Sequence, residues 1–430
     1  MKLRTFTLSM LTLASSLWSA SAKEQIIVLN EGAWQSDNSR LTYFEDGTVV
    51  SNEWFKTENG RKLGDTAIDI IQINDNLLAI AVNGSNLIQF ITPQGKAVAA
   101  TENVPNCRKL ASDGSYVYVT SYAHECTTVD GIKTFTKGFV AKIDIKTFNV
   151  VSAVEVGYEP EGIAYYNGHL FVANSGGYSY QEDHAYEKTV SVIKADDMSV
   201  VRTIDTGAPN LYGYMSQSGQ YLCINSSGDY YENMGATVIF DCQRALEGKP
   251  DTDCFVKLDF LSTYNTTTKD GLFYVVGSSF SFATNGYVYN YAILNPEEIM
   301  ATGGSQGKTE NFPGTFISDI QGMKAPNCIY VNPYTGYIYA TDATTYVEPG
   351  MLYQWTPEGK LTGKYQVYIN PGHIMALPPD GHFGSVTDVT TDFTPLTDDA
   401  VYNLQGIKVT DPQTGEIYIK NGKKFIYRPF

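Results

Sequence analysis

Short runs of alternating apolar and polar residues recur along most of the chain, and each run predicts a half-buried β-strand. Turn dipeptides such as Asp113-Gly114 and Asn167-Gly168 separate the runs and suit tight hairpins. The clearest runs lie at 25–30, 77–82, 116–121, 169–174, 287–294 and 336–341. The most helix-like stretch, from Pro296 to Met300, predicts a single turn at most. The pattern therefore predicts an all-β chain.

A longer phrase also returns at intervals, in which a Pro- or Gly-rich segment is followed by a strand, a tight turn and a second strand. It reads VPNCRKLASDGSYVYVTSY from Val104 and EPEGIAYYNGHLFVANSGGY from Glu159, and it returns from Ala208 and from Ala325. Repeats of this length indicate a ring of β-sheet blades. Seven inner strands are expected to begin near Asp65, Pro105, Pro160, Pro209, residue 276, Pro326 and Pro371. We therefore predict a seven-bladed β-propeller with a short C-terminal β module.

The ends of the chain predict how the ring is bounded. Residues 1–22 resemble a signal peptide, with Lys2 and Arg4 before an apolar stretch and an Ala20-Ser21-Ala22 cleavage site. Residues 23–385 are assigned to the propeller, and the strands IIVLN and RLTYFE near its start are expected to complete the last blade. Residues 386–430 form an acidic, Thr-rich linker and a tail with three strand-like pieces. No segment after the leader is apolar for long enough to span a membrane.

Charge and cysteine content narrow the function classes. The formal net charge of −16 argues against nucleic acid or an anionic lipid surface as partner. Cys242 and Cys254 flank the segment QRALEGKPDTD and are a candidate disulfide, with free thiols as the alternative. Cys107 and Cys328 occupy equivalent places in two repeats and are expected to be buried free thiols. No Cys or His spacing indicates a zinc site.

Candidate ligand-binding residues gather where the repeats differ from one another. In a propeller, the loops that enter the inner strands and the loops that join the second and third strands meet on one face. Tyrosine faces there cover apolar area, while amide and charged groups form hydrogen bonds, which suits a large, flat, amide-fringed ligand. The positions expected near the channel mouth are Asn106, Arg108, Glu159, Glu161, Asn210, Tyr212, Asn327 and His373. The positions expected in the next ring outward are Tyr122, His124, Tyr178, Tyr180, Tyr230, Tyr231 and Tyr346.

Structural roles compete with binding at several of these positions. A loop tyrosine often serves packing alone. Arg108 is expected either to pair with Glu159 or Glu161 from the next blade or to contact the ligand directly. Trp34 follows a Gly-Ala turn and is either a stacking platform or a core residue.

Six phrases in order carry a family resemblance, namely LNEGAW at 29–34, VPNCR at 104–108, VGYEPEGI at 156–163, VANSGGY at 172–178, KTVSVI at 188–193 and SSGDYY at 226–231. Over about residues 26–380 the chain resembles the YncE-like seven-bladed propellers exported by bacteria, and most closely the BtuG-like surface propellers that capture cobalamin. The resemblance implies a non-enzymatic protein that binds a corrinoid and passes it to a TonB-dependent outer-membrane transporter. It implies no cofactor apart from cobalamin as ligand. Imidazole is a competent transition-metal ligand, so His124 and His373 are candidate cobalt ligands, with a solvated loop histidine as the favoured alternative for each.

The chain departs from those surface lipoproteins in one respect, because no lipidated cysteine follows the leader. Its tail instead looks like the C-terminal sorting modules of exported bacterial proteins. We therefore expect a monomer that is held at the cell surface, on the outer membrane, or secreted. The alternatives are a propeller that binds a glycan or a partner protein, and a hydrolase or lyase that uses Glu159, Glu161 and Asn210 at the channel mouth. The G-x-S-x-G and H-E-x-x-H motifs are missing from the sequence, so an enzyme is not the expectation.

Overall fold

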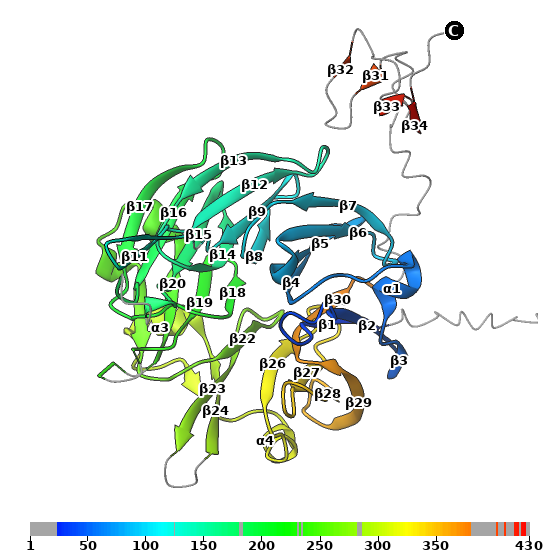
Figure 1. The fold of residues 1–430 in the computed structure, drawn as a ribbon. Helices are drawn as coiled ribbons and strands as arrows, with labels where there is room; N and C mark the ends of the chain where they lie inside the picture. Colours follow the sequence, from blue (N-terminus) through cyan, green and yellow to red (C-terminus); the bar gives the residue numbers. More distant parts are fainter. Residues whose placement is uncertain are drawn as a thin grey trace, which may run out of the picture. The chain divides into compact units, whose positions relative to one another are not determined.

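The computed structural model describes residues 24–379, apart from His124, 180–183, Tyr230, Tyr231, Met234 and 282–285, and four short strands beyond residue 400. Seven four-stranded antiparallel sheets are arranged as the blades of a ring, which confirms the predicted seven-bladed β-propeller (Figure 1). The inner strands of neighbouring blades contact one another all the way round, including β30 with β4, so the ring is closed.

From the innermost strand outward, the first three blades consist of β4 (Ala67–Asn74), β5 (Leu77–Val82), β6 (Leu87–Ile91) and β7 (Ala97–Glu102); β8 (Cys107–Ser112), β9 (Tyr116–Ser121), β12 (Phe139–Asp144) and β13 (Val150–Glu155); and β14 (Pro160–Tyr166), β15 (His169–Asn174), β16 (Thr189–Lys194) and β17 (Ser199–Asp205). The next three consist of β18 (Met215–Ser218), β19 (Tyr221–Ser226), β20 (Ala236–Asp241) and β21 (Phe255–Leu258); β22 (Tyr264–Thr267), β23 (Phe273–Ser281), β24 (Gly286–Leu294) and β25 (Lys308–Thr309); and β26 (Pro326–Val331), β27 (Ile338–Asp342), β28 (Pro349–Trp355) and β29 (Leu361–Ile369).

The seventh blade joins the two ends of the ring. Its inner strand is β30 (Pro371–Leu377), and its outer strands are β1 (Gln25–Asn30), β2 (Arg40–Glu45) and β3 (Thr48–Ser51). β1 pairs antiparallel with β30, with Val28 opposite Ile374. The prediction that the N-terminal strands complete the last blade is therefore confirmed.

One inner strand lies elsewhere than the sequence suggested. The fifth blade begins with β22 at Tyr264, and the region near residue 276 belongs to its second strand, β23. The buried side chains of β22 include Asn265 and Thr266, which are polar, so the strand carries no apolar alternation. The amide nitrogen of Asn265 instead donates to the carbonyl of Tyr214 at 3.0 Å and to Asn225 at 2.8 Å.

A recurring turn leads into the inner strands and explains the repeated phrase. The residue just before or near the inner strand has a positive φ in five blades, at Thr66, Asn106, Glu159, Asn210 and Asn370. Asparagine tolerates this left-handed conformation better than most residues. In six blades the carbonyl of this entry position accepts the backbone N–H that follows the second strand, in the pairs Thr66–Asn83, Asn106–Tyr122, Glu159–Ser175, Asn210–Ser227, Ala325–Ala343 and Asn370–Glu31. The phrase thus fixes the strand entries and the second-strand loops on one face of the ring.

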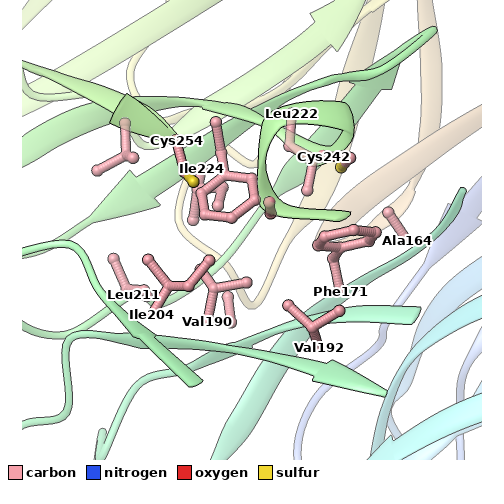
Figure 2. Close-up of a cluster of buried hydrophobic side chains, with 14 of the residues drawn as sticks. Ala164, Phe171, Val190, Val192, Ile204, Leu211, Leu222, Ile224, Cys242 and Cys254 are labelled. Carbon is pink, nitrogen blue, oxygen red and sulfur yellow. The ribbon is translucent and has the colours of Figure 1, made fainter. Parts of the chain in front are cut away.

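Apolar clusters between adjacent blades form the core. Phe171 of the third blade and Phe240 of the fourth meet with their ring centroids 5.9 Å apart, in a cluster that also holds Cys242 and Cys254 (Figure 2). Both cysteines are free thiols, so the candidate disulfide between them is not formed. Cys107 and Cys328 are buried free thiols, as predicted.

Few segments depart from the four-stranded pattern. A hairpin of β10 (Cys126–Val129) and β11 (Ile132–Phe135) is inserted in the second blade. The short helices are α1 (Trp54–Asn59), α2 (Cys242–Leu246), α3 (Pro296–Thr302) and α4 (Phe316–Ile320), with single 3-10 turns η1 (Asn83–Ser85) and η3 (Asp251–Asp253). In the part of the chain that the structure describes, no helix has the length and apolar character needed to cross a membrane.

The chain divides into two compact units, Met1–Asp380 and Gly381–Phe430. In the second unit four strands form one sheet in the order β32-β31-β33-β34, where three strand-like pieces were expected. Their bounds are β31 (Val401–Tyr402), β32 (Lys408–Val409), β33 (Ile417–Lys420) and β34 (Lys423–Ile426).

Candidate functional site

A cavity of about 770 Å³ opens on the face that carries the strand entries, and residues from all seven blades line it. Its lining is mainly tyrosine and asparagine, with four ionisable side chains. The tyrosines are Tyr178, Tyr212, Tyr214, Tyr264 and Tyr346, and the asparagines are Asn83, Asn86, Asn106, Asn327 and Asn370. The ionisable groups are Glu31, Arg108, Lys109 and Glu161. We call this space the axial cavity.

Seven of the fifteen predicted ligand-binding positions line the axial cavity. They are Asn106, Arg108, Glu161, Tyr178, Tyr212, Asn327 and Tyr346. The structure therefore brings together residues that lie up to 240 positions apart in the chain, although their contact with a ligand stays a prediction. His124, Tyr180, Tyr230 and Tyr231 lie outside the described residues.

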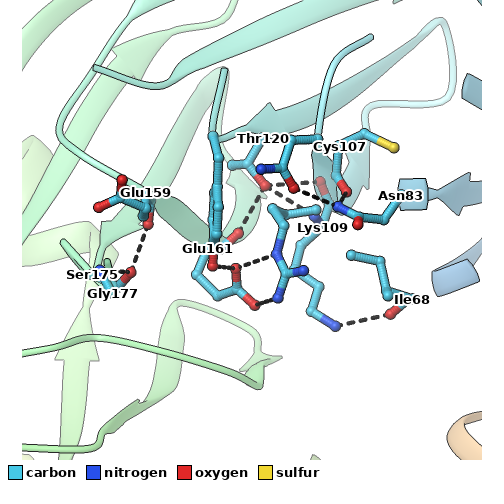
Figure 3. Close-up of polar contacts among 12 residues, drawn as sticks. Ile68, Asn83, Cys107, Lys109, Thr120, Glu159, Glu161, Ser175 and Gly177 are labelled. Carbon is cyan, nitrogen blue, oxygen red and sulfur yellow. Dashed lines mark hydrogen bonds and ion pairs between the residues drawn. The ribbon is translucent and has the colours of Figure 1, made fainter. Parts of the chain in front are cut away.

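Four other predicted residues lie in the walls of the ring rather than in the cavity lining. Tyr122 is buried and donates to Glu161 at 2.6 Å. The carboxylate of Glu159 is buried against His184, 2.8 Å away, and Figure 3 shows Glu159 beside Ser175, apart from Glu161. Asn210 is buried in its entry turn, where its backbone N–H donates to the carbonyl of Glu187.

His373, the fourth, faces Asp69 of the first blade. Its Nδ1 is 3.2 Å from the Asp69 carboxylate, and its ring stacks against Tyr214. Burial lowers the pKa of His373, with Lys109 acting in the same direction and Asp69 against it. Among the described residues, no group of three or more His, Cys, Asp or Glu side chains is placed to hold a metal ion.

A buried ion pair closes one side of the axial cavity. Arg108 donates from Nε and Nη2 to the two oxygens of Glu161, at 2.8 and 2.7 Å. The pair is strongly desolvated, because the side chains of Arg108 and Glu161 are only 15% and 1% exposed. Burial alone would raise the pKa of Glu161, but the Arg108 guanidinium lowers it below its usual value. Of the two predicted partners of Arg108, Glu161 is the one it contacts.

A β-bulge places a second cation in the same cavity. Arg108 and Lys109 are consecutive in β8, and strict alternation would send them to opposite faces. The register between β8 and β9 shifts between Cys107 and Leu110, so both residues line the cavity. Lys109 Nζ donates to the carbonyl of Ile68 at 3.0 Å (Figure 3). It also lies 4.8 Å from the centroid of the Tyr214 ring.

Glu31 adds a carboxyl group from the closing blade. It accepts a hydrogen bond of 2.9 Å from Asn370, which also accepts one of 2.8 Å from Asn327. Asn327 in turn accepts from the Tyr264 hydroxyl at 2.9 Å. Burial raises the pKa of Glu31, although Lys109 and Arg108 act to lower it. This chain of contacts holds the amide groups of Asn327 and Asn370 in fixed orientations.

Three exposed aromatic residues stand at the mouth of the axial cavity. Trp34, Tyr212 and Tyr346 line the cavity and are 64%, 43% and 46% exposed. They come from the seventh, fourth and sixth blades, and we call them the aromatic rim. Trp34 is thus not a core residue, and its role as a stacking platform stays a prediction.

The loop that carries Trp34 is held in place by polar contacts. Asn38 accepts from the backbone N–H of Ala33 at 2.9 Å, and Asp65 accepts from that of Gln35 at 2.9 Å. Gly32 has a φ of 81°, and a Cβ there would overlap the Asn38 side chain, so the turn requires glycine. Trp34 is therefore presented to solvent on a fixed backbone.

The prediction from sequence missed Glu31, Lys109, Tyr214, Tyr264 and Asn370. Glu31 and Asn370 stand in the phrases LNEG and INPG, which align with the loop and entry positions of other blades, so the repeat could have identified them. Tyr264 was missed with its strand, and Lys109 because the bulge cannot be read from alternation.

Fold and cavity together define the protein as a seven-bladed β-propeller with a polar and aromatic cavity on its axis. No family model and no curated protein matches the chain. Among solved structures it is similar to a protein of unknown function from Desulfotomaculum acetoxidans, at 14% identity and a TM-score of 0.52, over 83% of this chain and 99% of that one. It is also similar to a quinoprotein alcohol dehydrogenase-like protein from Bacteroides thetaiotaomicron, at 12% identity and a TM-score of 0.53, over 83% and 79%. At these identities the similarity shows the fold alone and does not test the YncE-like or BtuG-like resemblance.

Proposed function

We propose that this protein is a non-enzymatic binding propeller whose axial cavity captures cobalamin or a related corrinoid. The observation that carries the proposal is the aromatic rim of Trp34, Tyr212 and Tyr346 above a cavity lined by asparagine amides. The rim offers rigid flat surface to a macrocycle, and the amides offer donors and acceptors to the amide side chains around it. A corrinoid larger than the cavity would cover the mouth and direct some of its side groups inward.

The surroundings of Glu159 and Glu161, the two carboxylates predicted at the channel mouth, favour binding over turnover. Both oxygens of Glu161 accept hydrogen bonds from Arg108, and one also accepts from Tyr122. Glu159 is buried against His184 and does not line the cavity. A general acid or base must reach the substrate and exchange a proton with it, which neither arrangement favours.

The cellular role rests on the resemblance of residues 26–380 and on the leader-like residues 1–22. On that basis, the protein is exported, and it passes the captured corrinoid to a TonB-dependent transporter of the outer membrane. The rim would also stack on sugar rings, so a glycan is the second candidate ligand.

Size-exclusion chromatography with cyanocobalamin tests the proposal. The purified protein at micromolar concentration is expected to co-elute with the red ligand, which is recovered chemically unchanged. Trp34→Ala and Tyr212→Ala should each weaken binding about tenfold or more, as loss of a central aromatic contact does. Val201→Ala, at a 54% exposed position on the outer strand β17, is the control and should bind as the wild type does.

Two results would contradict the proposal. If cyanocobalamin elutes entirely apart from the wild-type protein, the corrinoid is not the ligand. Glycan binding that depends on Trp34 would then support a glycan as the ligand. A chemically altered ligand, with alteration lost in Glu161→Gln, would instead indicate an enzyme.

A further inference from the structure

The axial cavity presents two cations in a strongly acidic protein. The formal net charge of the chain is −16, yet both charged residues of β8, Arg108 and Lys109, are cations that line the cavity. No other Lys or Arg is found among the described residues of the lining. Two cations in the cavity of an acidic molecule are candidates for contact with a ligand group that carries negative charge.

The hydrogen-bonding capacity of both cations is only partly used. Glu161 engages Nε and Nη2 of Arg108, while Nη1 has no hydrogen-bond partner among the residues that the structure describes. Lys109 Nζ makes one hydrogen bond, to the carbonyl of Ile68, out of the three that an ammonium group can donate. Donors therefore remain for a ligand.

The two carboxyl groups of the lining compete weakly for these donors. Both oxygens of Glu161 already accept hydrogen bonds from Arg108, and one also accepts from Tyr122. Glu31 accepts from Asn370, and its raised pKa reflects the cost of keeping its charge in this buried place. Lys109 Nζ, whose hydrogen bond goes to a carbonyl oxygen, is therefore the cation more available to an anionic ligand group.

Tyr212 links this region to the aromatic rim. Its ring is 43% exposed, and it lines the axial cavity together with Arg108 and Lys109. Arg108 lowers the pKa of Tyr212, but burial and nearby carboxylates raise it overall, so the hydroxyl stays protonated as a donor. Tyr212 therefore belongs both to the aromatic rim and to the lining that holds the two cations.

We propose that Arg108, Lys109 and the Tyr212 hydroxyl form a subsite for a phosphate ester group of the ligand, which we call the cationic floor. This inference rests on the proposed function and deepens it, because it names the group that the floor recognises. A corrinoid suits the floor when it carries a phosphodiester in its nucleotide loop. Lysine binds phosphate as a point charge, and the free edge of the arginine supplies a directed donor.

Isothermal titration calorimetry with two corrinoids tests the cationic floor. Cyanocobalamin carries the phosphodiester, and dicyanocobinamide has the same corrin ring without it. Lys109→Met keeps the length of the side chain and removes the charge, and it should weaken cyanocobalamin binding about tenfold or more while changing cobinamide binding less than about twofold. Lys194→Met, at an exposed lysine outside the cavity, is the control and should change neither.

Equal losses for both corrinoids, or no loss for either, would overturn the subsite while the corrinoid function stands. Thermal unfolding of Lys109→Met establishes that the variant is folded. If the wild type binds neither corrinoid, the proposed function fails, and phenyl phosphate and phenol at millimolar concentration replace them. A preference for phenyl phosphate that Lys109→Met abolishes then supports the floor, and the absence of that preference overturns it.

Discussion

Arg108 and Glu161 stabilise one another at a place where either charge alone would be costly. Their two parallel hydrogen bonds, with Tyr122 as a third contact, satisfy a carboxylate that is 1% exposed. The sequence placed both residues near the channel and offered this pairing as one alternative, but it could not choose between Glu159 and Glu161. The choice depends on a bulge in β14 between Pro160 and Ile163, which alternation does not show.

Glu161→Gln is expected to destabilise the propeller by about 3–5 kcal/mol at pH 7, because it leaves the Arg108 charge buried without its partner. Glu155→Gln, on the exposed strand β13, is the matched control and should stay within about 0.5 kcal/mol. Denaturant unfolding measures both. The difference in unfolding free energy between the wild type and Glu161→Gln should be full above pH ~4.3, the pKa of a glutamate in the unfolded chain. It should disappear as the pH falls through the lowered pKa of Glu161 in the folded protein. An equal effect of both variants would contradict the buried pair.

The stability effect of Glu31→Gln is expected to depend on pH in the opposite direction from that of Glu161→Gln. Burial raises the pKa of Glu31, so the folded state binds its proton more tightly than the unfolded state does. The stability that this proton contributes is present in acid and lost as the pH rises through the raised pKa. The thermal midpoint of Glu31→Gln relative to wild type should therefore increase between pH 4 and pH 8. A difference that stays constant over this range would show that Glu31 does not titrate as described.

At the scale of single elements, the entry turns and the β-bulge of β8 determine which side chains line the axial cavity. The repeated Pro-Asn phrase was visible in the sequence because asparagine at a positive φ is a local requirement. The inner strand β22 was not visible, because its buried Asn265 and Thr266 depend on contacts with other segments, such as the Tyr214 carbonyl. Local chemistry could be predicted, whereas contacts between distant segments could not.

The closing blade gives an element-scale prediction. Ile26 of β1 is fully buried in a cluster with Phe44, Tyr339 and Ile374, where strands from the two ends of the ring meet. Ile26→Ala should lower the free energy of unfolding by about 2–5 kcal/mol through the lost burial and the cavity it leaves. Val50→Ala, at a 57% exposed position of β3 in the same blade, should change it by less than about 0.5 kcal/mol. Similar effects at the two positions would contradict the packed closure.

At the scale of the whole molecule, the ring determines where a ligand can bind but not which ligand binds. Seven blades were predictable because the repeat recurs along the chain and each copy predicts the same pair of strands. The face of the site was predictable for the same reason, since the copies differ in their loops. The aromatic rim was only partly predictable, because exposure of Trp34 depends on a loop that Asn38 and Asp65 hold in place.

The central claim is that a corrinoid binds over the axial cavity, against Trp34, Tyr212 and Tyr346. The most direct measurement is an anomalous difference map, collected at the cobalt edge, from crystals of the protein grown with cyanocobalamin. The account predicts one cobalt peak per chain above the mouth of the cavity, with the corrin ring against the rim. A cobalt peak on the outer strands of the blades, or a map without cobalt from crystals soaked to saturation, would contradict it.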